Sequence, residues 1–139
     1  MSEPTVHGSC LCGTVTFEIA PPFRIMAHCH CSRCRKATGT GHATNLLVGT
    51  DQLRWLSGEE TIKRYDLPTA KRFGKWFCGH CGSPLPRVNR NGRNVVVPAG
   101  SLDEEPPVQA TDHIFWDSRV SWGCPSGGLP THTAYPDSW

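Results

Sequence analysis

Three cysteines lie within six residues of one another, and their spacing limits what this part of the chain can form: Cys29, Cys31 and Cys34. In an extended backbone, residues two apart point to the same side, so Cys29 and Cys31 share a face. A tight turn after Cys31 would bring Cys34 toward the same point. Because zinc binds sulfur tetrahedrally at about 2.3 Å, this segment can supply three corners of a zinc site.

The fourth corner decides what such a site can do. A structural zinc site has four protein ligands, whereas a site that acts on a substrate leaves one position open. His28 and His42 are candidates for a fourth ligand, and either would close the site. His30 alternates with the cysteines, so we expect it to point away from the metal and to make a structural hydrogen bond.

Four more cysteines form two further pairs with metal-binding spacing: Cys10, Cys12, Cys78 and Cys81. The seven cysteines divide naturally into this four-thiol set and the three-thiol set. A rival division joins Cys31 and Cys34 to the Cys78–Cys81 pair as a zinc ribbon, and spacing alone leaves both divisions open. The eighth cysteine, Cys124, is expected to be a small buried residue or to reach a metal across the fold.

The setting expected for these thiols favours metal over disulfides. Residues two apart are a poor disulfide pair, and the stretch from Met1 to Gly8 has no apolar segment typical of a secretory signal. No apolar run approaches the length that spans a membrane. We therefore expect a cytoplasmic protein with reduced thiols. The formal net charge of +2 is too small to indicate a nucleic-acid partner.

Length and composition indicate a small β-rich protein. The 139 residues predict a single domain spanning residues 1–139, and 14 glycines with 12 prolines predict short strands joined by many turns. Ser32 is expected to cap a short helix over 33–38, and Asn91-Gly92 to form a hairpin turn in which both residues accept positive φ. The expected strands are 14–19, 23–28, 43–48, 52–56, 61–65, 71–77, 85–89, 94–97 and 113–116.

Four segments resemble, in order, the motifs of the glutathione-dependent formaldehyde-activating enzyme family, a group that also contains the centromere-protein-V domain. They are Gly8-Ser9-Cys10-Leu11-Cys12-Gly13, Cys29-His30-Cys31-Ser32-Arg33-Cys34-Arg35, Phe77-Cys78-Gly79-His80-Cys81-Gly82-Ser83 and Pro98-Ala99-Gly100-Ser101-Leu102-Asp103. The resemblance implies a mainly β, Mss4-like fold of several coiled antiparallel sheets with two zinc ions. By position, the four-thiol set would bind a structural zinc, and Cys29, Cys31 and Cys34 a catalytic-type zinc.

The function implied by the resemblance is that of a carbon–sulfur lyase acting on S-(hydroxymethyl)glutathione, with glutathione as the small thiol partner. Zinc on three thiolates is a weak generator of hydroxide but still favours the thiolate form of an incoming sulfur ligand. Arg33, Arg35 and Lys36 are candidates, from proximity alone, to receive the carboxylates of such a thiol. The alternative is a non-catalytic zinc-binding module with a structural or interaction role.

Overall fold

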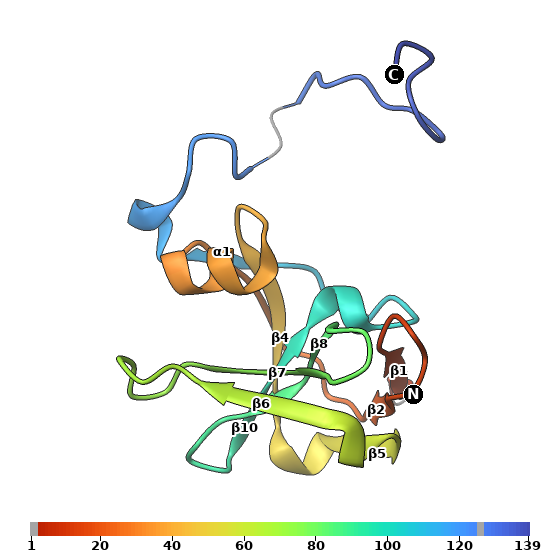
Figure 1. Ribbon diagram of the computed structural model, residues 1–139, viewed down its shortest axis with the longest axis vertical. Helices are drawn as coiled ribbons and strands as arrows, with labels where there is room; N and C mark the ends of the chain where they lie inside the picture. Colours follow the sequence, from red (N-terminus) through yellow and green to blue (C-terminus); the bar gives the residue numbers. More distant parts are fainter. Residues whose placement is uncertain (1–2, 125–126) are drawn as a thin grey trace.

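The computed structural model describes residues 3–124 and 127–139, and the strands of this part form three sheets (Figure 1). The first sheet has the order β1-β2-β5, with β1 Val6–Ser9, β2 Thr16–Ile19 and β5 Leu53–Ser57. The five-stranded sheet has the order β11-β3-β4-β10-β9, with β11 Asp112–Ile114, β3 Ile25–Cys29, β4 Ala43–Gly49, β10 Asn94–Pro98 and β9 Arg87–Val88. The third sheet has the order β6-β7-β8, with β6 Ile62–Asp66, β7 Gly74–Cys78 and β8 Pro84–Leu85.

Alternating apolar residues build these sheets around a shared core. Phe17 and Ile19 of β2 are fully buried, as are Val95 and Val97 of β10 and their neighbour Leu46 of β4. Such alternation is typical of strands that turn one face to the core. Residues from all three sheets contribute to this cluster, and in Figure 1 β6 and β7 run across β4 and β10.

One short helix, α1 Ser32–Thr38, connects β3 to β4 at one end of the sheets (Figure 1). Its N-cap is Cys31, whose sulfur accepts the backbone N–H of Cys34 at 3.3 Å. The prediction that Ser32 caps the helix was therefore wrong by one residue. The helix ends at Gly39, which has a φ of 74° in the left-handed region where glycine is favoured.

The mainly β fold with several antiparallel sheets is confirmed. One pairing departs from the expectation, because β11 pairs with β3 in parallel and places His113 opposite His28. The hairpin between β9 and β10 is also as predicted. However, Gly92 has a positive φ of 72° and Asn91 does not, so only one residue of that turn is left-handed.

Short 3-10 turns complete the described chain: η1 Thr50–Gln52, η2 Glu59–Thr61, η3 Ala99–Ser101 and η4 Trp116–Ser118. Residues 127–139 are mostly exposed and extend away from the sheets (Figure 1). Among the residues that the structure describes, no helix is both long and apolar enough to cross a membrane.

Candidate metal centres

Four thiols from two distant turns converge between the first and third sheets, and they are Cys10, Cys12, Cys78 and Cys81. Their sulfur atoms all lie within 4.8 Å of one another. The sulfurs of Cys10 and Cys12 are 3.6 Å apart, and those of Cys12 and Cys78 are 3.8 Å apart. A tetrahedron with zinc–sulfur bonds of about 2.3 Å has edges of about 3.8 Å, so these spacings suit one zinc ion.

Local hydrogen bonds favour the thiolate forms of two members of the four-thiol set, Cys81 and Cys12. The Ser83 hydroxyl lies 3.2 Å from the sulfur of Cys81, and this contact, with the Ser83 backbone N–H, lowers the pKa of Cys81 to about 5. The Thr14 hydroxyl and N–H lower the pKa of Cys12 in the same way. Since the thiolate is the metal-binding form, these contacts prepare Cys12 and Cys81 for a cation. Burial and the neighbouring thiols of Cys81 and Cys10 raise the pKa of Cys78.

The second set combines the end of β3 with the start of α1. Cys29 is the last residue of β3, Cys31 caps α1, and Cys34 lies in its first turn, with the sulfurs of Cys29 and Cys31 3.5 Å apart. Burial raises the pKa of Cys29, and it raises that of Cys34 strongly together with the neighbouring thiols. For Cys31, burial is outweighed by hydrogen bonds from backbone N–H groups and from the thiols of Cys34 and Cys29, so its pKa is lowered. A bound cation would offset the mutual repulsion of three thiolates in this place.

The three-thiol set has no fourth ligand among residues 3–124 and 127–139: no other histidine, cysteine, aspartate or glutamate there joins it. The two histidines considered for that corner are engaged elsewhere. Nδ1 of His28 lies 2.7 Å from the Thr44 hydroxyl, and Nδ1 of His42 lies 3.3 Å from the same oxygen. Seven of the eight described thiols therefore group as four plus three, and the zinc-ribbon division considered from the sequence is not the one seen.

The three-thiol set opens onto a cavity of about 1010 Å³ that also contacts β3, β4 and the segment after β11. Among the described residues, its charged lining consists of four basic side chains, Arg33, Lys71, Arg72 and Arg87, and one acidic side chain, Asp112. The positive excess gives this cavity a preference for anionic ligands.

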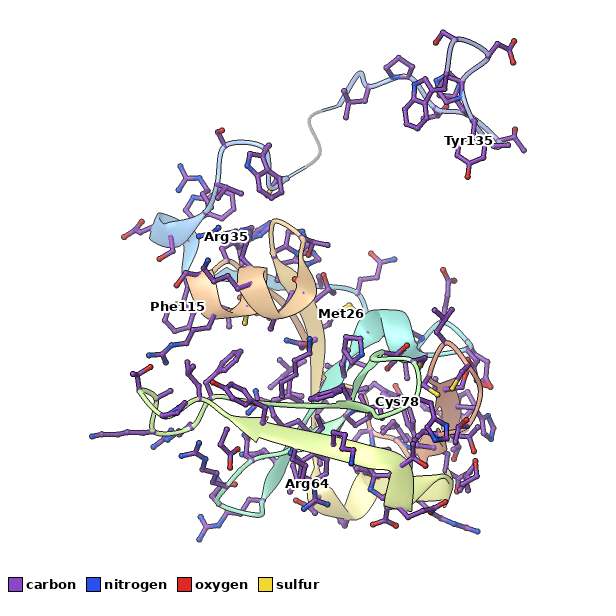
Figure 2. All side chains as sticks on the ribbon, viewed as in Figure 1. Met26, Arg35, Arg64, Cys78, Phe115 and Tyr135 are labelled. Carbon is purple, nitrogen blue, oxygen red and sulfur yellow. The ribbon has the colours of Figure 1, made fainter. Side chains whose placement is uncertain are left out.

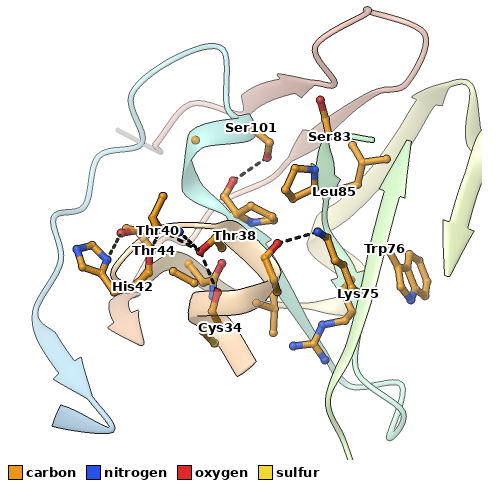
Figure 3. Close-up of a pocket in the computed structure, with 18 of the residues that line it drawn as sticks. Cys34, Thr38, Thr40, His42, Thr44, Lys75, Trp76, Ser83, Leu85 and Ser101 are labelled. Atoms are coloured by element: carbon orange, nitrogen blue, oxygen red, sulfur yellow. Dashed lines mark hydrogen bonds between the residues drawn. The ribbon is translucent and has the colours of Figure 1, made fainter. Parts of the chain in front are cut away.

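A second cavity of about 910 Å³ shares one thiol with the first. Cys34 lines both cavities, and Figure 3 shows it on α1 beside Thr38. Across the second cavity, the ammonium group of Lys75 on β7 donates to the Ala37 carbonyl at 2.7 Å (Figure 3). This bond ties the helix that holds two of the thiols to the third sheet.

Comparison with known proteins decides the family. The family model of the glutathione-dependent formaldehyde-activating enzyme matches residues 5–118 of the chain. The chain belongs to this family. A crystal structure of a Rhodobacter sphaeroides protein, a structural genomics target, is similar to it with a TM-score of 0.61 and 25% identity, over 77% of this chain and 98% of that chain. A search of the curated proteins found no match.

The basic residues that line the cavity beside the three-thiol set differ from those expected from the sequence of this formaldehyde-activating family member. Of the three cations proposed from proximity, Arg33 lines the large cavity, whereas Arg35 and Lys36 line neither cavity. Arg87 was missed, although it contributes a guanidinium to the cavity wall. Burial lowers the pKa of Arg87, and its side chain lines the same cavity as Cys34.

The segment after the family match carries the remaining cysteine. Cys124 lies with His30 and His113 in a third group of potential ligands, separate from both thiol sets. His30 is buried and makes the expected structural hydrogen bond, because its Nε2 lies 2.8 Å from Nδ1 of His113. The sequence offered no signal for this partnership, since it depends on the parallel pairing of β11 with β3.

Proposed function

We propose that this chain is a zinc-dependent carbon–sulfur lyase acting on a thiol–aldehyde adduct such as S-(hydroxymethyl)glutathione. The observation that carries the proposal is the three-thiol set with no fourth protein ligand in the described chain, opening onto a cavity with excess positive charge. The name of the family supports glutathione and formaldehyde as the reacting pair.

The proposal includes two zinc ions in different roles. Cys10, Cys12, Cys78 and Cys81 would hold a structural ion, because four ligands complete a tetrahedron. Cys29, Cys31 and Cys34 would hold a catalytic-type ion. When bound there, zinc would supply a Lewis acid that favours the thiolate form of an incoming sulfur ligand.

The cavity residues would orient the rest of the substrate. Glutathione carries two carboxylates and one ammonium group, and the cavity offers the guanidinium groups of Arg33 and Arg87 and the carboxylate of Asp112. Guanidinium groups bind carboxylates in a bidentate manner, which fixes direction as well as position. Arg87 is held by its bonds to the Arg72 carbonyl at 3.2 Å and to the Asn89 side chain at 3.4 Å. It is therefore pre-oriented for such a contact.

The reaction needs no redox partner. In the forward direction a bond forms between the thiol sulfur and the aldehyde carbon, while the thiol proton ends on the aldehyde oxygen and yields a hydroxymethyl group. In the reverse direction the same bond breaks and the aldehyde is released. The protein's task is to hold the sulfur and the aldehyde at short range within the cavity, which is the proximity contribution to catalysis.

Cobalt-substituted protein provides a direct test of the open position. Titration with glutathione should produce new sulfur-to-cobalt charge-transfer bands, whereas S-methylglutathione, which has no ionisable thiol, should not. In parallel, exchange-rate measurements by NMR should show that the zinc form accelerates interconversion of formaldehyde and the glutathione adduct. The Arg87→Gln variant should bind glutathione about ten-fold more weakly through loss of a charged hydrogen bond, and Arg64→Gln on β6, outside the cavity, should not.

The competing function is a structural or interaction module in which the second metal never meets a substrate. Unchanged cobalt bands at millimolar glutathione, together with an uncatalysed exchange rate, would establish this alternative and overturn the lyase proposal.

A further inference from the structure

Three potential ligands from separate parts of the chain meet beside the three-thiol set: His30, His113 and Cys124. One atom of each lies within 4.8 Å of the other two. Nε2 of His30 and Nδ1 of His113 are 2.8 Å apart, whereas two nitrogens on one tetrahedral zinc are about 3.3 Å apart. Because His113 is exposed, a shift of about half an ångström by its ring would admit an ion between them.

The buried histidine of this group lacks a protein partner on one side of its ring. His30 is completely buried, and its Nδ1 has no hydrogen bond within the described chain. Because an ion here would bind Nε2, Nδ1 would carry the N–H of the neutral ring. The burial of this imidazole beside a second imidazole and a thiol is the feature that points to an ion. The rings of His42 and Trp116 also pack around it, with centroids 5.1 and 5.0 Å away.

The position of Cys124 is set by a close contact between two glycines. A Cβ atom added to Gly41 would lie 2.3 Å from the Cα of Gly123. The backbone before β4 and the backbone before Cys124 therefore pack directly against each other. A hydrogen bond from the N–H of Gly123 to the Val120 carbonyl at 3.1 Å shapes the same turn. This backbone packing places the Cys124 thiol next to the two histidines.

We propose that His30, His113 and Cys124 form a third metal site that takes one borderline divalent ion, Zn²⁺ foremost. Two imidazole nitrogens and one thiolate are a ligand set that suits zinc. Binding would move the proton between the two rings to the outer nitrogen of one ring, so that both imidazoles stay neutral, and it would release the thiol proton. It would also tie residues 119–124 to strands β3 and β11. Cys124 lies beyond residues 5–118 that match the family model, so the site is an addition to the family's framework and does not depend on the lyase proposal.

Metal content of the full chain tests the site. After zinc loading and removal of free metal, the unmodified protein should contain one more ion per chain than Cys124→Ser and than His113→Gln, as measured by elemental mass spectrometry. The matched control is His132→Gln, because His132 is an exposed histidine of the tail outside the cluster. It should retain the full metal content.

A second readout separates this site from the others. Hydrogen exchange of residues 119–124 should be faster in Cys124→Ser than in the unmodified protein when both are zinc-loaded. Cys31→Ser should lose an ion from the three-thiol set while exchange in residues 119–124 stays slow. Equal metal content in the unmodified protein and Cys124→Ser would overturn the proposal, and so would an exchange rate that does not respond to zinc.

Discussion

At the scale of the residue, Phe115 combines backbone strain with exposure. Its φ of 55° makes it the one residue other than glycine with a positive φ in the described chain. Such a conformation costs an L-residue about 1–2 kcal/mol, and a side chain that is 64% exposed recovers little of this by burial. Phe115 lines the large cavity, and in Figure 2 it lies beside α1, well apart from Cys78. Strain kept in this way is typical of ligand-binding positions.

We expect the Phe115→Asn variant to lose binding without losing stability. Asparagine tolerates the left-handed region, so the free energy of unfolding should rise by about 0–1 kcal/mol, while glutathione affinity falls through loss of the ring. Chemical denaturation and calorimetric titration measure the two effects. Phe115→Leu is the control, because it removes the ring but keeps the strain. A stability loss above about 1 kcal/mol in Phe115→Asn would contradict this view.

At this scale the sequence predicted the thiols better than the cations. Within each motif the cysteines lie two or three residues apart in the sequence, and this spacing by itself indicates metal binding. Arg33 and Arg35 look equivalent in the sequence, yet residues two apart on a helix point to opposite faces, and only Arg33 lines the cavity. Arg87 follows Cys34 by 53 residues, and only the packing of β9 near α1 reveals its place.

At the scale of the element, the N-terminal end of α1 carries two thiols of the three-thiol set, and specific residues cap both ends of the helix. Cys31 caps the first turn with its sulfur, and Gly39 ends the last turn, donating its N–H to the Arg35 carbonyl at 2.8 Å. Sequence propensity favoured Ser32 as the cap because hydroxyls cap helices far more often than thiols do. The parallel β11–β3 pairing was equally beyond local patterns, since strand partners are chosen by tertiary packing.

The Gly39→Ala variant should be less stable by about 1 kcal/mol, because alanine pays the left-handed backbone cost. A Cβ at Gly39 would meet no atom within 4 Å, so no clash contributes. Gly100→Ala is the matched control: its Cβ would also meet nothing within 4 Å, and its φ is not positive. Urea denaturation of both variants checks the expectation. Equal stability of the two would mean that the end of α1 is not held in the left-handed form.

At the scale of the whole molecule, the four-thiol set joins sheets that are remote in sequence. The sulfur contact between Cys12 and Cys78 spans 66 residues. Structural zinc binding is worth roughly 10–16 kcal/mol in small domains, as much as the entire net stability of a typical domain, roughly 5–15 kcal/mol. Loss of the proposed structural ion would therefore remove free energy comparable to the whole net stability of the fold.

Serine substitutions should separate the two thiol sets. Cys12 is exposed, so Cys12→Ser removes almost no packing, yet it should abolish or greatly lower the cooperative thermal transition through loss of the structural ion. Cys31→Ser should keep that transition and lose one ion. Calorimetry with metal analysis measures both. A Cys12→Ser variant that melts like the unmodified protein would show that the four-thiol set does not hold a stabilising metal.

The unequal spans of the two thiol sets also order events during synthesis. The three-thiol set is complete once Cys34 has left the ribosome, whereas the four-thiol set waits for Cys81, 47 residues later, a delay of about 2–9 seconds at ordinary elongation rates. If both sets bind zinc as we propose, a nascent chain would bind its first ion at the three-thiol set, and the structural ion of the four-thiol set would bind second. When zinc is scarce, the nascent chain would bind metal at the three-thiol set before the four-thiol set has joined the sheets.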